Sequence, residues 1–497
     1  MTRFTDGPPI SPDDFAASIA TFVSVETEKG RRLPGIPTLG GYSFLFGDLH
    51  GNPKNFLEES DQTAGRLIEL GKTMFDSDPL STKGDSQIPS AYTYFGQFID
   101  HDLTRLMKFP GDELKVGMLP FDLDNIPRLS NSRSSQLDLD CIYGPPVEYG
   151  EPYQIPRDKS GNKFLIEMAI TSHDPTYPNK PIRPDTDLPR DPNPQGLHPA
   201  YIGDRRNDEH LIISQMHVAF LRAHNALVDN GASFDEARKT LRRLYQYVVV
   251  NDYLPRLVEP SIITDLLSDE LNVFDRTDED VSIPLEFSVA AFRTCHSMIR
   301  NVYNYNENLE RLGLLLIFYP TFLGGYHHVL ERWIIDWPRF FDGRNTARVL
   351  GPKLGPDLAF LDTHTPFDLA TVDLLKGFLV RLPTGEAVAK YLGEMPLRWD
   401  QIAEVTSDAQ QQALIKGGFI NRTPLWFYLL CEAATRKDGR LGTVGGKIVA
   451  SVIVGLARKS KDSYLRFREW IPKFGKGKGF DLYDLFDLAG VLPNSTN

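Results

Sequence analysis

The strongest chemical signal in the sequence is a group of polar side chains inside an otherwise apolar segment, residues 94–102. Gln97 and His101 are four residues apart and would share one face of a helix, with Asp100 beside them. A lone histidine there would be read as a satisfied core residue. Four ionisable or amide groups within six residues favour a site, because buried polar groups at this density need partners or a ligand.

A second group, residues 203–210, precedes a long segment with helical periodicity. Asp and Asn at such a position commonly cap a helix, which accounts for Asp204, Asn207 and Asp208. Capping does not account for Arg206 and Glu209, which are three residues apart on one predicted face. These two side chains are therefore candidates for chemistry.

Three histidines, His210, His217 and His224, are spaced at seven-residue steps along this segment. The spacing permits metal ligands, although it would need carboxylates or histidines from elsewhere. For His217 and His224 we favour interior hydrogen bonding over metal binding.

Two further segments carry candidate side chains. Arg293 and His296 lie within an apolar helical segment, where a solitary buried histidine is usually structural. Oxygen-bearing side chains alternate at Ser134, Asp138 and Asp140, and the backbone carbonyl of Gln136 is available between them. Hard oxygen ligands along one extended edge suit Ca²⁺, which takes six to eight of them, but by spacing alone this could also be an exposed polar loop.

The elements that must position these groups are mostly helices, because the 3.6-residue apolar period dominates and alternating strand patterns are scarce. We predict one large, mainly α-helical domain over residues 41–497 with few short strands and long loops, preceded by an N-terminal arm, residues 1–40. A small hairpin is expected near residues 163–170 and an irregular loop over residues 174–199. The segments predicted to be helical are 209–230, 234–257, 284–299, 366–380, 423–434 and 446–457.

Composition excludes several classes of protein. Apolar residues make up 41% of the 497, enough for a large core, and the net charge of −12 argues against a broad nucleic-acid-binding surface. The three cysteines are too few for a disulfide framework. No GxGxxG or GxxxxGK[ST] motif supports dinucleotide or P-loop chemistry. No transmembrane segment and no secretory signal are visible, so we expect a cytoplasmic protein, or one exported without a recognisable signal peptide.

The four segments together resemble the animal-type haem peroxidases of the peroxidase–cyclooxygenase superfamily, with a myeloperoxidase-like catalytic domain. The motifs FGQFIDHD, LDLDxIYG, GDxRxxE and FRxxHS occur in the family's order, and the resemblance covers residues 89–455. It implies that His101 is the distal histidine above the haem iron, with Arg206 and Gln97 as its catalytic partners. It also implies that His296 is the proximal iron ligand.

The resemblance further implies which residues hold the cofactors. Asp100 and Glu209 match the carboxylates that form ester bonds to haem b in mammalian members, whereas His210 replaces a methionine, so a third covalent link is not expected. Asp373 and Lys376 match the partner of the proximal histidine and a propionate-binding residue, although the family has Asn and Arg there. The implied calcium ligands are Asp102, Ser134, Gln136, Asp138 and Asp140.

Arg293 decides between two branches of the family, because the cyclooxygenases and related dioxygenases carry tyrosine at this position. Arginine resembles the peroxidase branch, in which it pairs with a haem propionate. The implied function is a haem-dependent peroxidase that reduces hydrogen peroxide by heterolysis at ferric haem and oxidises a small reductant, such as a halide, a phenol or a biosynthetic intermediate. The alternatives are a fatty-acid dioxygenase or, on the strength of the tripeptide Lys83-Gly84-Asp85, an adhesion protein.

Overall fold

The described part of the chain extends from residue 40 to residue 492. The computed structural model leaves gaps at 79–84, 106–117, 125–128, 145–154, 172–179, 181, 192–197, 269–270, 272, 275–281, 319–327, 362–366, 437, 461, 468–469 and 476–478. The predicted arm, residues 1–40, and two residues of the tripeptide, Lys83 and Gly84, thus lie outside it, apart from Gly40. Asp85, the third residue of the tripeptide, begins a strand and pairs with Arg300 at 2.8 Å.

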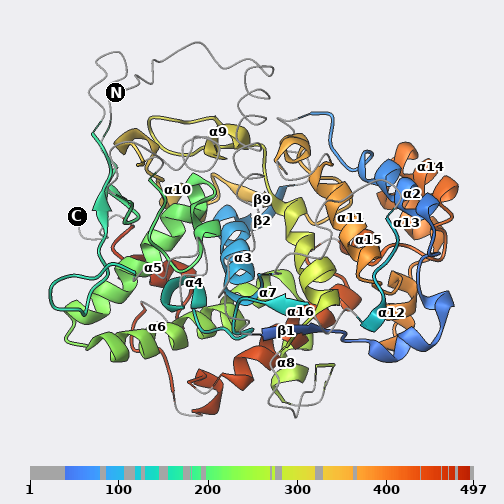
Figure 1. Cartoon of the computed structure of the whole chain (residues 1–497). Helices are drawn as coiled ribbons and strands as arrows, with labels where there is room; N and C mark the ends of the chain where they lie inside the picture. Colours follow the sequence, from blue (N-terminus) through green and yellow to red (C-terminus); the bar gives the residue numbers. More distant parts are fainter. Residues whose placement is uncertain are drawn as a thin grey trace.

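The fold is mainly helical, as predicted, with the helices gathered around a central α3 (Figure 1). The α-helices of four or more residues are α2 (Asp61–Gly71), α3 (Ser90–Leu103), α4 (Asp140–Tyr143), α5 (Leu211–Asp229), α6 (Phe234–Val248), α7 (Leu254–Leu257), α8 (Pro260–Leu267), α9 (Leu314–Phe318), α10 (Pro338–Phe341), α11 (Leu369–Leu379), α12 (Gly385–Tyr391), α13 (Trp399–Val405), α14 (Asp408–Gly417), α15 (Leu425–Ala434), α16 (Thr443–Lys459) and α17 (Leu482–Leu488).

The strands are short and form four small sheets among the described residues, with the orders β3-β1-β6, β2-β9, β4-β5 and β7-β8. Within the predicted hairpin region, Glu167–Met168 pairs antiparallel with Thr186–Asp187, which lies inside the segment predicted to be an irregular loop. The strands are β1 (Gly40–Ser43), β2 (Asp85–Pro89), β3 (Ser130–Asn131), β4 (Glu167–Met168), β5 (Thr186–Asp187), β6 (Ser282–Pro284), β7 (Val302–Tyr303), β8 (Leu312–Gly313) and β9 (Thr346–Arg348).

Helix α3 carries the first polar group through the core. It begins directly after Pro89 and ends where Thr104 turns to extended backbone. Every one of its residues except Gln97 is buried, so the carboxyl and imidazole groups near its C-terminal end are surrounded by protein. It packs against α5 and against a 3₁₀ segment, η7 (Phe292–Met298).

Helix α5 begins two residues later than the periodicity predicted. His210 has extended backbone and serves as the N-cap, since its Nδ1 accepts a hydrogen bond from the amide of Ile213 at 3.3 Å. Residues Arg205–Asp208 before it form a separate 3₁₀ turn, η4, capped by Asp204. This break in the helix lets Arg206 and Glu209 leave the axis of α5 and face α3.

The segment predicted as one helix over residues 284–299 is helical, but its geometry is not regular. Strand β6 occupies its start, a π-helical turn, η6 (Glu286–Ala291), follows, and η7 completes it. A second π-helical turn, η5 (Val249–Tyr253), joins α6 to α7. Mid-helix 3₁₀ and π turns are frequently found at functional positions, and His296 lies on one of them.

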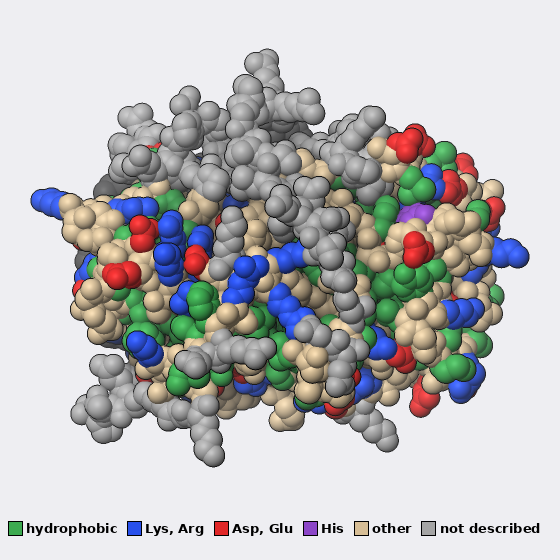
Figure 2. Space-filling model, turned by 90° about the horizontal axis from the view of Figure 1, so that it is seen from below, with side chains coloured by type: hydrophobic (Ala, Val, Ile, Leu, Met, Phe, Trp, Pro, Cys, Tyr) green, Lys and Arg blue, Asp and Glu red, His purple; other side chains and the backbone are tan. Residues whose placement is uncertain are grey.

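The face toward which the C-terminal end of α3 runs carries Lys and Arg side chains near its centre (Figure 2). This basic surface contrasts with the net charge of −12 for the whole chain. Among the described helices, none is long and apolar enough to cross a membrane.

Candidate active site

The three α3 side chains singled out by their spacing lie in one buried group with different partners. His101 is 5% exposed, and its Nδ1–H donates to Oδ1 of Asn207 at 2.8 Å. Burial, with the Arg206 cation adding to it, lowers the pKa of His101 to about 4. The imidazole is therefore neutral near pH 7, and its Nε2 is left without a hydrogen-bond partner in the described part of the chain.

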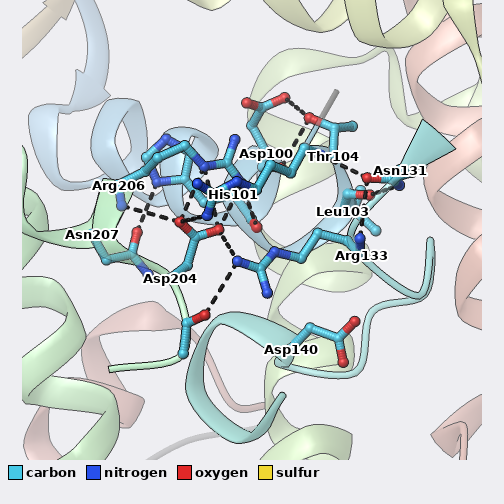
Figure 3. Close-up of polar contacts among 12 residues, drawn as sticks. Asp100, His101, Leu103, Thr104, Asn131, Arg133, Asp140, Asp204, Arg206 and Asn207 are labelled. Carbon is cyan, nitrogen blue, oxygen red and sulfur yellow. Dashed lines mark hydrogen bonds and ion pairs between the residues drawn. The ribbon is translucent and has the colours of Figure 1, made fainter. Parts of the chain in front are cut away.

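Arg206 is held beside His101, although not against its ring (Figure 3). Its Nη2 donates to the backbone carbonyl of His101 at 3.0 Å and to Asp204 at 2.7 Å. The guanidinium is thus fixed on two sides, and about one fifth of the side chain stays accessible. A fixed, partly accessible cation next to a neutral imidazole can stabilise negative charge that develops on a bound molecule.

Asp204 forms ion pairs with three arginines, a cluster that the sequence did not indicate. Arg133 and Arg105 join Arg206 on its carboxylate, and both Arg133 and Asp204 have fully buried side chains (Figure 3). Burial opposes ionisation, but the three guanidinium groups hold the pKa of Asp204 well below its usual range. Because three guanidinium groups share one carboxylate, this cluster carries excess positive charge. The Nε and Nη1 of Arg133 are buried without a partner.

Asn207 is the site residue that sequence reasoning missed, because a helix-capping role was assigned to it. Its Oδ1 accepts from His101 and its Nδ2 donates to Nδ1 of His217 at 3.0 Å. Neither Asn207 nor His217 is exposed to solvent. His217 therefore makes an interior hydrogen bond, as favoured, and so does His224, whose Nδ1 binds the Tyr143 hydroxyl at 2.8 Å.

Gln97 is held by His210, the residue that caps α5. Because Nδ1 of His210 accepts from the backbone, its proton lies on Nε2, which donates to Oε1 of Gln97 at 2.9 Å. Burial lowers the pKa of His210 to about 3, so this bond is made by a neutral ring. The orientation leaves the amide NH₂ of Gln97 free to donate to a bound molecule.

Glu209 stands out electrostatically. Burial raises the pKa of Glu209 to about 7, against the opposing effect of Arg206. This carboxyl group lacks a neutralising bond in the described structure, and it would gain from any partner that removes its charge from the protein interior.

Asp100 connects the two halves of the site. Its Oδ2 lies 3.1 Å from Nη1 of Arg293, and Thr104 donates to Oδ1 at 2.9 Å. Burial raises the pKa of Asp100, but Arg293 and Arg206 outweigh it and the net pKa is lowered. Arg293, expected to pair with a propionate, thus pairs here with Asp100, and its Nε donates to the carbonyl of Ser288.

His296 is held by Asp373, the residue matched to it only by register. Nδ1–H of His296 donates to Oδ2 of Asp373 at 2.7 Å, across 77 residues of chain. Asp373 lies on α11, whose N-terminus is capped by Asp368, and it is 4% exposed. Lys376, three residues further along α11, is exposed.

The two histidines, His101 and His296, share one bonding pattern. Each uses Nδ1 for a bond to protein and leaves Nε2 unengaged among the described residues. Asp373 is the kind of carboxylate partner that orients a metal-ligating imidazole and raises its basicity. The Asp100–Arg293 ion pair ties α3 to η7, so the two imidazoles are carried by elements that pack on each other.

The candidate calcium loop is not the extended edge that the alternation predicted. Ser135 and Leu139 adopt left-handed backbone, with φ of 57° in both, and Asp140 begins the short helix α4. Two left-handed residues coil the loop, because each reverses the local chain direction. Asp140 is drawn inward by this coil and accepts the backbone N–H of Ser134 at 2.7 Å.

An oxygen atom that could bind a cation remains unpaired in this loop, because Oγ of Ser134 is buried without a partner. Asp102, at the end of α3, accepts the amide of Leu139 through Oδ2, and its carboxyl group also interacts with the buried Tyr245 hydroxyl. Burial, then Asp140 and Asp138, raises the pKa of Asp102 well above its usual range. Within the described ranges no three acidic, histidine or cysteine side chains converge on one point as a ready-made metal site.

Asp138 and Gln136 contribute less to this group. Asp138 receives the Ser460 hydroxyl at 3.0 Å, and its backbone carbonyl accepts Nε of Arg242 at 2.5 Å. Gln136 lies half-buried in the same coil. The donor set therefore fits a cation through Asp102 and Ser134 better than through Asp138.

A cavity of about 560 Å³ borders Asp373 but not His296. Asp373 is in its wall, and the remaining lining includes His50, Phe56, Arg422 and Trp426. Gln97, His101 and Arg206 do not line it. This void is therefore separate from the distal group.

Comparisons with known proteins show what this chain is similar to. The family model described as animal haem peroxidase matches residues 121–315, which include the candidate calcium loop, Arg206 and His296 but not α3. A peroxidase-like protein of Margaritifera margaritifera is 27% identical over 344 residues, covering 56% of this chain and 40% of that protein. The chain is thus similar to animal haem peroxidases, by a family model over residues 121–315 and by curated relatives with peroxidase names.

The matches cover less than half of the length of the relatives reported. Thyroid peroxidase of Canis lupus familiaris is 25% identical over 293 residues, covering 53% of this chain and 30% of the relative. The chain thus spans well under two thirds of the length of these curated relatives.

Two solved structures share the fold at low identity. Peroxidase A of Dictyostelium discoideum has a TM-score of 0.52 at 15% identity, covering 88% of this chain and 93% of that one. The fatty acid alpha-dioxygenase of Oryza sativa has a TM-score of 0.56 at 14% identity, covering 93% and 92%. Members with both names therefore share this architecture, and the fold alone does not select between their activities.

Proposed function

We propose that this protein is a haem peroxidase that reduces hydrogen peroxide and oxidises a small reductant. The observation that carries the proposal is that two histidines have different hydrogen-bond partners at Nδ1. His296 is anchored at Nδ1 by a carboxylate, while His101 is neutral, buried and fixed at Nδ1 by a neutral amide. The first arrangement suits a metal ligand and the second suits a proton acceptor.

Haem b would be held between these elements, with His296 Nε2 as the iron ligand and with Asp100, Glu209, Arg293 and Lys376 around its edge. When bound, it supplies the iron that receives peroxide and the oxidising equivalents passed to the reductant. Its propionates would also balance the excess positive charge of the arginines. In this proposal Arg293 would contact a propionate, and its ion pair to Asp100 would last only until that carboxylate is esterified.

His101, Arg206 and Gln97, on the distal side of the proposed haem, would each have a different role in the reaction with peroxide. Nε2 of His101 would accept a proton from one peroxide oxygen and return it to the other as the O–O bond breaks, a dual role open to an imidazole that is neutral at rest. The Arg206 cation stabilises the negative charge that builds on the departing oxygen. The Gln97 amide, held by His210, orients peroxide or the water that replaces it.

Calcium is the second cofactor of the proposal. It would bind Asp102 Oδ1, Ser134 Oγ, the Gln136 carbonyl and the Asp138 and Asp140 carboxylates, which are hard oxygen ligands of the kind Ca²⁺ takes. The buried, unpaired Oγ of Ser134 supports this assignment. Because Asp102 follows His101 directly, the cation would brace the distal helix.

Ester links from Asp100 and Glu209 to the haem form part of the same proposal. Each side chain has one feature that suits ester formation. Asp100 is held in place by Arg293 and Thr104, and Glu209 has no ion-pair partner among the described residues. An ester would remove the charge that burial penalises at Glu209.

A fatty-acid dioxygenase is the second candidate, and the chain's own residues disfavour it. Arg293 stands where that branch carries tyrosine, and it is fixed in an ion pair with Asp100. Tyr303 and Tyr305 are fully buried, and Tyr303 is hydrogen-bonded to Tyr94 at 2.8 Å, so neither replaces the missing tyrosine.

The experiment is rapid mixing of the purified ferric protein with hydrogen peroxide, alongside oxygen uptake with a polyunsaturated fatty acid. We expect a fast spectral change with peroxide that slows by about 10²–10⁴-fold in His101→Ala, and no lipid-dependent oxygen uptake. The exposed-site variant Lys72→Ala is the control. Oxygen uptake that persists in Arg293→Ala would replace the peroxidase proposal by the dioxygenase.

A further inference from the structure

We propose that Asn207 and His217 are positioning residues that fix the tautomer of His101, so that its Nε2 carries the lone pair that takes the peroxide proton. The inference rests on the proposed peroxidase function and adds two side chains to its machinery. Neither residue needs to touch peroxide or haem to act in this way.

The geometry imposes a constraint on the two histidines. Both present Nδ1 to the same side-chain amide, His101 to Oδ1 at 2.8 Å and His217 to Nδ2 at 3.0 Å. An amide has an acceptor at one end and a donor at the other. One of the imidazoles must therefore carry its proton on Nδ1 and the other a lone pair there, so their tautomers are opposite.

The orientation of the amide decides which histidine is which. With Oδ1 toward His101, the proton of that ring lies on Nδ1 and Nε2 is bare. With Nδ2 toward His217, that ring carries its proton on Nε2. The reverse orientation would put a proton on Nε2 of His101 and block it as a base.

The surroundings keep this arrangement free of competition from water. Asn207 and His217 are 0% exposed, His101 is 5% exposed, and the ring of Phe98 packs edge-on against His217 at 6.3 Å. Burial holds the pKa of His217 at about 3, so it stays neutral, and Asp204 is the charged group that opposes this shift. In this setting a hydrogen bond, once lost, is not replaced by solvent.

A purely structural role for these residues makes a different prediction. If His217 only filled the core, an aromatic ring of similar size would serve. If it acts as the acceptor that orients Asn207, a residue with an acceptor near the Nδ1 position would serve instead. His217→Phe tests the first and His217→Asn the second, because the oxygen of asparagine lies near the position of Nδ1.

His224 provides a matched control on the same helix. It lies seven residues further along α5 and is buried, and its ring nitrogens bind Tyr143 and the carbonyl of Asn162, away from the distal group. His224→Phe therefore removes a buried histidine of the same helix without changing the amide next to His101.

The decisive readout is the tautomer itself, from the imidazole ¹⁵N chemical shifts of the full-length chain, with the His101 signal assigned by its loss in His101→Gln. We expect an Nδ1–H tautomer in the native protein, in His217→Asn and in His224→Phe. A neutral hydrogen bond is worth up to about tenfold in an equilibrium, so His217→Phe and Asn207→Leu should mix the tautomers by that factor.

The rate of reaction with hydrogen peroxide should follow the tautomer, falling up to about tenfold in Asn207→Leu and His217→Phe and recovering in His217→Asn. An Nε2–H tautomer in the native protein, or one unmoved by Asn207→Leu and His217→Phe, would overturn the inference. A native protein inert to peroxide would instead sink the proposed function, and the ¹⁵N shifts would still decide the tautomer.

Discussion

The bond between His296 and Asp373 gives the most direct quantitative prediction. The bond is short, 2.7 Å from the imidazole Nδ1 to the carboxylate, and Asp373 is only 4% exposed, so solvent weakens it little. Asp373→Asn keeps the size and an acceptor oxygen but removes the negative charge. Hydrogen bonds to charged groups are worth about 1.5–3 kcal/mol and neutral ones about 0.5–1.5 kcal/mol, so the change removes about 1–2 kcal/mol.

This energy should appear in the reduction potential of the bound haem. The carboxylate increases the electron density on His296, which stabilises the ferric state more than the ferrous state. If the whole loss falls on the ferric state, the potential rises by about 40–90 mV for a one-electron couple. The assay is a spectroscopic redox titration of the native and variant proteins under the same buffer and salt.

The matched control is Asp368→Asn, at the N-cap of α11, five residues before Asp373. Asp368 caps α11 through the amide of Thr371, and asparagine caps as well as aspartate, so this change should leave the potential within error. An unchanged or lower potential in Asp373→Asn would refute the assignment of Asp373 as the partner of an iron-ligating His296.

Three further predictions rest on other parts of the site. Because His101 must be neutral to accept a proton and burial lowers its pKa to about 4, the rate of reaction with peroxide should stay level from pH 7 to 5 and halve near pH 4; a midpoint near 6.5 would contradict the buried imidazole. Burial raises the pKa of Glu209 to about 7, so its ionisation destabilises the haem-free fold as pH rises from 4.5 through 7. Glu209→Gln should therefore add up to about 3 kcal/mol to the free energy of unfolding at pH 8 and little at pH 4.5, with the exposed Glu404→Gln as control. Chelation of calcium should lower the melting temperature of the native protein but not further that of Asp102→Ala, since a ligand at 100 times its Kd stabilises by about 2.7 kcal/mol; active protein without calcium by metal analysis would dismiss this site.

Local pattern was enough to predict the elements that carry the distal group. The spacing of Gln97, Asp100 and His101 within an apolar run fixes them near one another on α3, because helical neighbours three and four residues apart share a face. The 3.6-residue apolar period also indicated the mainly helical fold. These predictions depend on contacts within a few residues, which the chain order itself determines.

Chain order could not show the partners that decide the chemistry. The bonds from His101 to Asn207 and from His296 to Asp373 join residues 106 and 77 positions apart, and the ion pair of Asp100 with Arg293 joins two different helices. Such pairs depend on how helices pack, and packing is a property of the whole core.

The candidate calcium loop, residues 134–140, shows the same limit at short range. Alternating side chains predicted an extended edge, whereas left-handed backbone at Ser135 and Leu139 coils the loop and turns Asp140 inward. A non-glycine residue adopts that conformation at a cost that only surrounding contacts can offset. The sequence by itself thus determined which side chains could do chemistry, and the tertiary structure decided which of their atoms are held, charged or left free, because burial and long-range contacts set those states.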